Sequence, residues 1–264
     1  MHFKAIILDL DGRVYTGNKV IPGVSKTIKQ LRAKGIKIFF LSNASMKTRK
    51  QQAEKLQVMG INCKITEMYN TAYATASYIK HHHPKSTVYV VSEGGLQQEL
   101  KAVGLKLAAN EHATIVATGL DTKITFEKLT TALRAIRNGA KFIASNVDRV
   151  YPTEKGILPG SGTIAAFLEY GTGKKPVVIG KPEPYMVEAV MKENKIKKKD
   201  LLIVGDNYET DLRAAKRMKI KCALVLTGLT KQKDVRKMKK KDKPDFVLKS
   251  VVELPSFLMQ SNRF

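Results

Sequence analysis

The sequence predicts an α/β fold built on a doubly wound parallel sheet, with a second α/β segment inserted into it. Short apolar runs that end in polar, glycine-bearing sequence recur near both ends of the chain, as buried parallel strands followed by loops do. Segments with helical periodicity separate these runs, and this alternation is typical of α/β proteins. The 264 residues are enough for one core with an insertion or for two unequal domains.

The elements of the main sheet are expected in two blocks. In the first block, residues 3–8 form a strand, residues 24–34 form a helix that ends before Gly35, and residues 36–41 form the next strand. The second block lies towards the C-terminus. Its strands are expected at 176–179, 201–204, 222–226 and 246–248, and its helix at 209–218.

The stretch between these blocks has its own alternation of strands and helices. It predicts strands at 87–91, 114–117 and 142–144, and helices at 96–103 and 126–137. We therefore place an inserted α/β domain at residues 80–175. The main domain is then expected to comprise residues 1–79 and 176–264.

The composition favours a folded protein that works in the cytoplasm. The hydrophobic fraction of 43% is ordinary for globular proteins, and no apolar stretch approaches the roughly 20 residues that a membrane span requires. The N-terminal apolar run is too short for a signal peptide. Cys63 and Cys222 lie far apart and belong to no CxxC motif, as expected for a reducing compartment. We expect no membrane partner, and a homo-oligomer remains possible.

The charge balance is strongly basic. With 47 basic and 23 acidic residues, the formal net charge is +24, which attracts anions such as phosphate compounds. The densest runs, at 195–199 and 236–243, could contact nucleic acid, but such runs are more often solvated surfaces. Nucleic acid is therefore not the expected partner, although the charge does not exclude it.

Two pairs of aspartates follow strands of the predicted main sheet. Asp9 and Asp11 come after the first strand, and Asp206 and Asp211 come after the strand at 201–204. Because the carboxyl ends of parallel strands share one edge of a sheet, these four carboxylates could converge. Hard oxygen ligands without nitrogen or sulfur suit Mg²⁺ better than zinc. The sequence therefore predicts a magnesium site.

Polar residues follow two other predicted strands. Ser42 and Asn43 come after the strand at 36–41, and Lys181 comes after the strand at 176–179. Hydroxyl, amide and ammonium groups are suited to hold a phosphate group at that edge. Taken alone, however, a loop lysine is more often an exposed surface residue.

The spacing of Asp9 and Asp11 is suited to catalysis. Side chains two residues apart point to the same side if strand geometry continues through them. One carboxylate can then attack a phosphate ester while the other transfers protons, and Gly12 lets the chain turn away. The alternatives are that both aspartates cap a turn and that Asp206 caps a following helix.

Four motifs in this order resemble the haloacid dehalogenase-like (HAD) hydrolase superfamily, in its NagD-like, p-nitrophenylphosphatase-type branch. The resemblance covers nearly the whole chain and implies a Rossmann-like core sheet with an inserted α/β cap domain. The motifs are DLDGRVYTG at 9–17, LSNAS at 41–45, GKPEP at 180–184 and GDNYETD at 205–211. Segments that resemble the cap of that branch lie at 118–121, 145–148 and 159–163.

The resemblance implies catalytic and binding roles for several residues of these motifs. Asp9 is expected to be the nucleophile that forms an aspartyl-phosphate, and Asp11 the general acid and base. Ser42 and Asn43 are expected to contact the phosphoryl group. Lys181 is expected to steady both the nucleophile and the phosphate.

The same resemblance implies a metal shell and a set of substrate contacts. Asp206 is expected to bind Mg²⁺ together with Asp9, and the backbone carbonyl of Asp11 to be a further ligand. Asp211 is expected to support the metal directly or through water. The other residues expected to approach the substrate are Asn207, Asn146 and Asp148.

Two positions depart from the usual pattern of the family. Arg13 stands where a small or aliphatic residue is common, and Ala44 replaces a frequent asparagine. Neither change removes a catalytic group. Because Arg13 adds positive charge beside the nucleophile, we expect a preference for substrates with more than one anionic group, such as nucleotides or bisphosphates.

The expected function is that of a Mg²⁺-dependent phosphatase acting on small phosphorylated metabolites. Nucleotide monophosphates, sugar phosphates and, in vitro, p-nitrophenyl phosphate are the candidate substrates. A phosphoryl-transferring or phosphonate-cleaving enzyme on the same scaffold is an enzymatic alternative, against which Asp11 argues. The alternative from another class is a basic nucleic-acid-binding protein with a vestigial or secondary phosphatase site.

Overall fold

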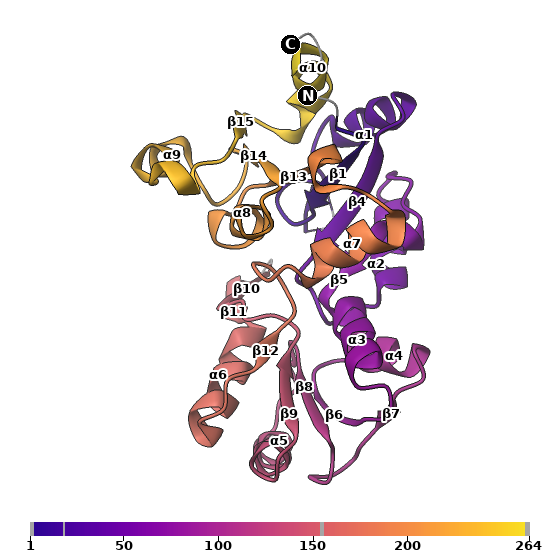
Figure 1. The fold of residues 1–264 in the computed structure, drawn as a ribbon, viewed down its shortest axis with the longest axis vertical. Coiled ribbons are helices and arrows are strands. Elements are labelled where there is room, and N and C mark those ends of the chain that lie inside the picture. Colours follow the sequence, from indigo (N-terminus) through magenta and orange to yellow (C-terminus); the bar gives the residue numbers. More distant parts are fainter. Residues whose placement is uncertain (1–2, 18, 154–155, 262–264) are drawn as a thin grey trace. The chain divides into compact units, whose positions relative to one another are not determined.

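The computed structural model describes residues 3–17, 19–153 and 156–261 of the chain. They form an α/β protein with two parallel sheets, which confirms the predicted fold class (Figure 1). The chain divides into two compact units, each built around one of the sheets. The first unit comprises Met1–Ser42, Ala53–Tyr69 and Val187–Phe264, and the second comprises Asn43–Gln52 and Asn70–Met186.

The first unit contains a six-stranded sheet with the order β15-β14-β13-β1-β4-β5. From β1 the chain continues outward through β4 and β5, whereas β13 leads to β14 and β15 on the other side. The strand order therefore reverses between β1 and β13, where open parallel sheets bind ligands. The strands are β1 (Ala5–Asp9), β4 (Lys37–Ser42), β5 (Met68–Asn70), β13 (Leu201–Gly205), β14 (Lys221–Val225) and β15 (Phe246–Leu248).

The central strand β1 is apolar from Ala5 to Leu8 because it has a parallel neighbour on each side and lies in the core. Ile6 and Leu8 are fully buried, and Ile7 pairs with Ile203 of β13 and with Phe39 of β4. A strand buried on both faces loses its alternation of polar and apolar residues. The first polar residue of β1 is therefore Asp9, at the carboxyl end of the strand.

Helices accompany this sheet, and the first of them was predicted closely. In α1 the apolar residues Val24, Ile28 and Leu31 are buried, and the chain leaves the helix at Gly35 with φ +77°. The helices that belong wholly or in part to this unit are α1 (Val24–Ala33), α2 (Arg49–Val58), α7 (Tyr185–Asn194), α8 (Arg213–Met218), α9 (Gln232–Lys237) and α10 (Leu254–Ser261). A short antiparallel pair, β2 (Tyr15–Thr16) and β3 (Lys19–Val20), follows β1.

The second unit contains a five-stranded parallel sheet with the order β12-β9-β8-β6-β7. Apolar side chains of α5 and α6 form its core together with those of the central strands. The strands are β6 (Thr87–Val91), β7 (Lys106–Leu107), β8 (Ile115–Thr118), β9 (Lys141–Ala144) and β12 (Val177–Val178), with a hairpin of β10 (Val150–Thr153) and β11 (Gly156–Pro159). The helices are α3 (Thr71–His82), α4 (Gly95–Ala102), α5 (Phe126–Arg137) and α6 (Ser161–Thr172).

One predicted strand joins a different sheet from the one expected. The run at 176–179 was assigned to the main sheet, but β12 pairs with β9, so that Val177 lies opposite Ile143 in the second unit. A strand of only two paired residues is too short for its sequence to indicate which sheet it joins. The second unit therefore continues to Met186, and the predicted insertion at 80–175 lies inside it.

The two cysteines are buried and poorly reactive. Cys63 and Cys222 are both free thiols, and burial raises their pKa values to about 12 and about 11. Thiols with such pKa values form little thiolate near neutral pH and react slowly.

Among the described residues no helix has both the length and the apolar character needed to cross a membrane. The cytoplasmic location stays a prediction.

Asp245 lies just before β15 and forms a charged cluster with residues of β14 and α8. Its carboxylate lies 2.7 Å from Lys221 Nζ and 3.2 Å from Lys216 Nζ, and it accepts a 3.0 Å hydrogen bond from the Cys222 amide. Burial alone would raise the pKa of Asp245, but these donors outweigh it and lower the pKa from 3.8 to about 2.

Asp245→Asn should therefore destabilise the protein in a pH-dependent way. The ionised carboxylate contributes fully above its ordinary pKa of 3.8, and this contribution is lost as the pH falls towards 2. Because solvent screens the lysines, we expect a loss of about 1 kcal/mol in the free energy of unfolding at pH 7. Urea unfolding at pH 7 and at about pH 3 measures the difference, with the exposed Glu188→Gln as control. Equal effects of the two substitutions at pH 7 would contradict this role.

Candidate active site

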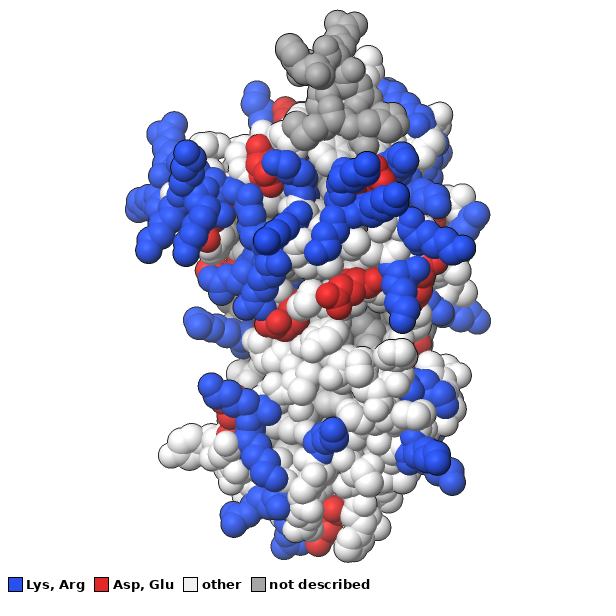
Figure 2. Space-filling view, in the orientation of Figure 1, with Lys and Arg blue, Asp and Glu red and all other residues white. Residues whose placement is uncertain are grey.

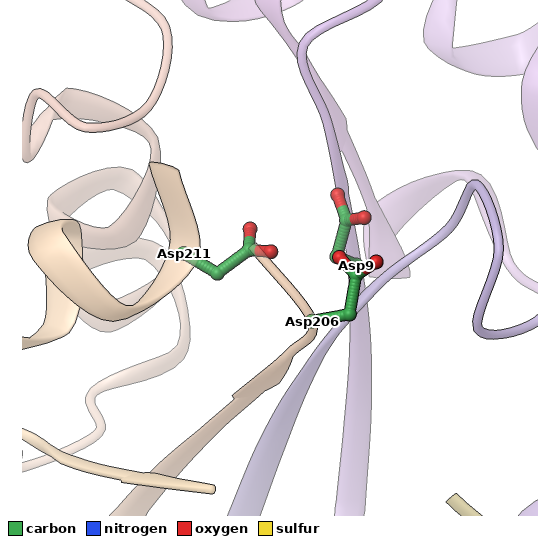
Figure 3. A group of neighbouring side chains, drawn as sticks. All are labelled: Asp9, Asp206 and Asp211. Atoms are coloured by element: carbon green, nitrogen blue, oxygen red, sulfur yellow. The ribbon is translucent and has the colours of Figure 1, made fainter. Parts of the chain in front are cut away.

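Three carboxylates meet where the strand order of the first unit reverses. Asp9 ends β1, Asp206 follows β13 directly, and Asp211 lies in the π-helical turn Tyr208–Leu212. One carboxylate oxygen of each residue lies within 4.8 Å of the others, and Figure 3 shows Asp211 directed towards the other two. Asp206 and Asp211 are each only 1% exposed. In the described part of the chain, no other set of three or more acidic, histidine or cysteine side chains is placed to hold a metal ion.

Two glycines give these carboxylates their space. A Cβ atom on Gly205 would collide with the Asp211 side chain, and one on Gly228 would overlap the Asp206 carboxylate. The chain next to Gly228 also holds Asp206, because the Leu229 amide donates a 2.5 Å hydrogen bond to Asp206 Oδ2. Sequence reasoning missed Gly228, although its position just after β14, at the carboxyl end of a core strand, was a usable signal.

Asp11 lies outside this group of three carboxylates. Its side chain is exposed, and the chain turns beside it, because Gly12 adopts φ +80° and its amide bonds the carbonyl of Tyr15 at 2.8 Å. The sharp turn expected at Gly12 is confirmed. An exposed carboxylate can exchange protons with a substrate or with water, as a general acid and base must.

Arg13 occupies the space between the three carboxylates. It is only 7% exposed, its Nη1 lies 2.7 Å from Asp9 Oδ2, and its Nη2 contacts Asp206 Oδ1. The same Nη2 is 3.8 Å from Asp211 Oδ2. One guanidinium thus faces three carboxylates.

The donor set of this cluster fits Mg²⁺. Carboxylate oxygens are the protein ligands that Mg²⁺ prefers, and the described cluster offers no nitrogen or sulfur ligand that would favour zinc. Gly205 and Gly228 allow Asp211 and Asp206 to come this close to each other and to Asp9. Asp9, Asp206 and Asp211 are thus the residues that would hold Mg²⁺.

The other polar residues of the first unit lie on neighbouring elements. Ser42 ends β4, the strand beside β1, and is 2% exposed. Asn207 follows Asp206, and its Oδ1 accepts a 2.9 Å hydrogen bond from the Glu209 amide. Helix capping was the alternative role predicted for Asp206, and here Asn207 performs it. The Nδ2 group of Asn207 remains as a donor.

A second group of predicted site residues is joined by hydrogen bonds within the second unit. Asn43 Nδ2 donates to Asp148 Oδ1 at 3.0 Å and to the Lys181 carbonyl at 3.1 Å, while Asn43 Oδ1 accepts from the Lys181 amide at 2.9 Å. Gly180 permits this approach, because a Cβ there would lie 2.9 Å from Asn43 Oδ1. Residues separated by more than 100 positions are thus fixed side by side.

Both polar atoms of the Asn146 side chain take part in this network. Its Nδ2 donates a 2.6 Å hydrogen bond to the Asn43 carbonyl, and its Oδ1 accepts from the Asp148 amide at 3.1 Å and from the Ser161 hydroxyl. These hydrogen bonds hold Asn146 beside Asn43 and Asp148. The geometry gives Asn146 the task of positioning Asn43 and Asp148.

Comparison with known proteins identifies the family. A model described as haloacid dehalogenase-like hydrolase matches residues 6–106, and a HAD-hydrolase-like model matches residues 178–254. The chain is 38% identical over 253 residues to an acid sugar phosphatase of Staphylococcus saprophyticus, covering 96% of this chain and 97% of that protein. The chain belongs to the haloacid dehalogenase-like hydrolases.

Solved structures place this HAD-like hydrolase in the NagD-like branch. A p-nitrophenyl phosphatase from Archaeoglobus fulgidus superimposes with a TM-score of 0.92 at 34% identity, covering 97% of this chain and all of that one. NagD from E. coli K-12 gives a TM-score of 0.88 at 28% identity, with 96% and 98% of the chains covered. The predicted enzyme class, a phosphoric monoester hydrolase of the HAD type, is confirmed.

Proposed function

We propose that this HAD phosphatase hydrolyses small phosphorylated metabolites with Mg²⁺ and forms an aspartyl-phosphate at Asp9. The observation that carries the proposal is the convergence of Asp9, Asp206 and Asp211 at the reversal of strand order. A carboxylate placed there can serve as a nucleophile, and its neighbours can hold the cation that a phosphate ester requires.

Asp9 and Asp11 divide the chemistry of the proposed reaction. Asp9 attacks the phosphorus atom, the bond from phosphorus to the leaving oxygen breaks, and Asp11 supplies the proton that this oxygen takes up. Asp11 then removes a proton from a water molecule, which attacks the aspartyl-phosphate and releases inorganic phosphate. Asp9 is thereby restored as a carboxylate.

The remaining residues bind and orient the phosphate in this proposal. Magnesium held by Asp9 and Asp206, with support from Asp211 and the Asp11 carbonyl, would supply positive charge to the phosphoryl oxygens. Ser42 is assigned as a phosphoryl contact. The further assigned contacts are Asn43, Lys181, Asn207 and Asp148, whose roles rest on the sequence motifs.

Sugar phosphates are the first substrates to test. The acid sugar phosphatase of S. saprophyticus aligns over nearly the whole of this chain, and the A. fulgidus structure is named a p-nitrophenyl phosphatase. Nucleotide monophosphates belong in the same panel because of the basic charge of the chain. The oligomeric state and the cytoplasmic location stay predictions.

Phosphate release from p-nitrophenyl phosphate, sugar phosphates and nucleotide monophosphates tests the proposal. With Mg²⁺ we expect turnover, and with EDTA we expect a fall of about 100-fold or more that added Mg²⁺ reverses, because the phosphoryl charge is then no longer neutralised. Turnover that EDTA leaves unchanged would contradict the magnesium requirement. Failure to release phosphate from any member of the panel would contradict the substrate class.

The nucleic-acid alternative has its own discriminating measurement. Exposed basic side chains gather over α9 and the segment that follows it (Figure 2). These exposed residues are Lys231, Lys233, Arg236, Lys237, Lys239, Lys240, Lys241 and Lys243. Micromolar or tighter binding to nucleic acid that falls steeply with salt, without phosphatase turnover, would favour the alternative.

A further inference from the structure

Arg13 is an unexpected neighbour of the three carboxylates, because nothing in the sequence indicated that its side chain would be buried against them. Its positively charged guanidinium lies buried against Asp9 and Asp206, with Asp211 close by. A surface arginine that attracts substrates would instead keep its donors in solvent. The donors of Arg13 are directed at the enzyme's own carboxylates.

Such a pairing stabilises the cluster when no metal is bound. Two of the three carboxylates are 1% exposed, so their mutual repulsion is poorly screened and each lacks most of its hydration. A guanidinium offers parallel N–H donors to two carboxylates at once. Arg13 therefore takes the place of a counter-ion in the metal-free cluster.

The same pairing opposes the entry of a metal ion. Asp206 Oδ1 contacts Arg13 Nη2, and Asp206 Oδ2 already accepts from the Leu229 amide. Asp9 Oδ2 is bonded to Arg13 Nη1 at 2.7 Å. A divalent cation bound by Asp9 and Asp206 would meet the guanidinium at a distance where two positive charges repel strongly.

One further feature favours displacement of the arginine. Arg13 Nε is buried without a hydrogen-bond partner in the part of the chain that the structure describes. A buried donor that lacks a partner costs free energy, so this position of the side chain is less stable than its ion pairs alone suggest. A rival cation can thus displace it more readily.

We propose that Arg13 is a built-in counter-ion that competes with Mg²⁺ for Asp9 and Asp206 and thereby sets the metal affinity of this enzyme. This inference rests on the metal site of the proposed function. It also differs from the preference for polyanionic substrates that the sequence suggested, because the guanidinium charge is offset by the carboxylates until the metal displaces it.

Two substitutions test the competition. Arg13→Thr removes the charge and the bulk of the side chain, whereas Arg13→Met removes the charge and keeps most of the bulk. Calorimetric titration of the metal-free proteins with Mg²⁺ should give a Kd at least about 10-fold lower for both variants, which corresponds to about 1.4 kcal/mol. Without metal, both variants should melt about 4 °C or more below the wild type, and saturating Mg²⁺ should remove most of that difference.

The matched control is Arg213→Met in the same unit. Arg213 pairs with Glu209 at 2.8 Å, its side chain is 42% exposed, and among the described ion pairs it has none with Asp9, Asp206 or Asp211. Its Mg²⁺ affinity and melting temperature should stay close to those of the wild type. If Arg13→Thr is unfolded in EDTA, the counter-ion role is supported, and the Mg²⁺ dependence of its melting temperature then gives the affinity.

The outcomes separate this inference from the function on which it rests. Magnesium-dependent turnover with Kd values of the Arg13 variants within threefold of the wild type would overturn the competition alone. Unchanged melting of both variants without metal would overturn the counter-ion role. Turnover that persists in EDTA, with no Mg²⁺ binding by any of the proteins, would overturn the magnesium site itself.

Discussion

Asp9→Asn is expected to lower kcat for p-nitrophenyl phosphate by about 10³-fold or more, because an amide cannot act as the attacking carboxylate. The substitution keeps the shape of the side chain at the end of β1, so the fold should survive. The amide also loses a negative charge that the proposed metal site uses, which adds to the effect. Steady-state kinetics at saturating Mg²⁺ measures the loss in kcat, and thermal unfolding measures whether the fold survives.

A control and a trapping experiment make this result specific. Asp200→Asn changes an aspartate of the same unit that pairs only loosely with Lys4, at 3.9 Å, and it should keep kcat within about twofold. Wild-type enzyme quenched in acid during turnover of a ³²P-labelled substrate should carry a label that hydroxylamine removes, as acyl phosphates do. Label on the Asp9→Asn protein, or more than a tenth of wild-type kcat, would contradict the assignment of the nucleophile.

The fold was predictable wherever one apolar pattern determined the element. The strand at 87–91 and the helix at 126–137 have the predicted bounds, because the strand is a nearly continuous apolar run and the helix has apolar residues at helical spacing. The helix α2 gave no such signal, since it is mostly polar and buries few apolar residues, among them Ala53 and Leu56. Pairing of β12 with β9 depends on contacts between distant segments, which local periodicity does not encode.

The site was predictable to the extent that sheet topology controls it. Asp9 and Asp206 meet because the carboxyl ends of parallel strands lie at the same edge of the sheet. Predicting this meeting needs no knowledge of side-chain directions. The partners of Arg13 do depend on side-chain direction, so the sequence indicated its charge but not the carboxylates that receive it. The requirement for Gly228 depends on the packing of a separate loop against Asp206.

Asp11→Asn is the second substitution with a large expected effect, and that effect should depend on the leaving group. A sugar alcohol is a poor leaving group that needs a proton, so kcat/KM for sugar phosphates should fall about 10²-fold to 10⁴-fold. Nitrophenolate leaves without protonation, so kcat/KM for p-nitrophenyl phosphate should fall much less. Gly12 adopts φ +80° and its amide donates to the Tyr15 carbonyl, so this turn should persist in the variant.

The second half of the reaction provides an independent readout for Asp11. Because the same carboxylate is proposed to activate water, the variant should form the aspartyl-phosphate from p-nitrophenyl phosphate faster than it hydrolyses it. Rapid mixing should then show a burst of nitrophenolate followed by slow turnover, and the trapped label should exceed that of the wild type. Equal losses for both substrates without a burst would mean that Asp11 positions the loop and transfers no proton. A burst combined with a selective loss on sugar phosphates requires one carboxylate that acts as acid and then as base, which the exposed position of Asp11 allows.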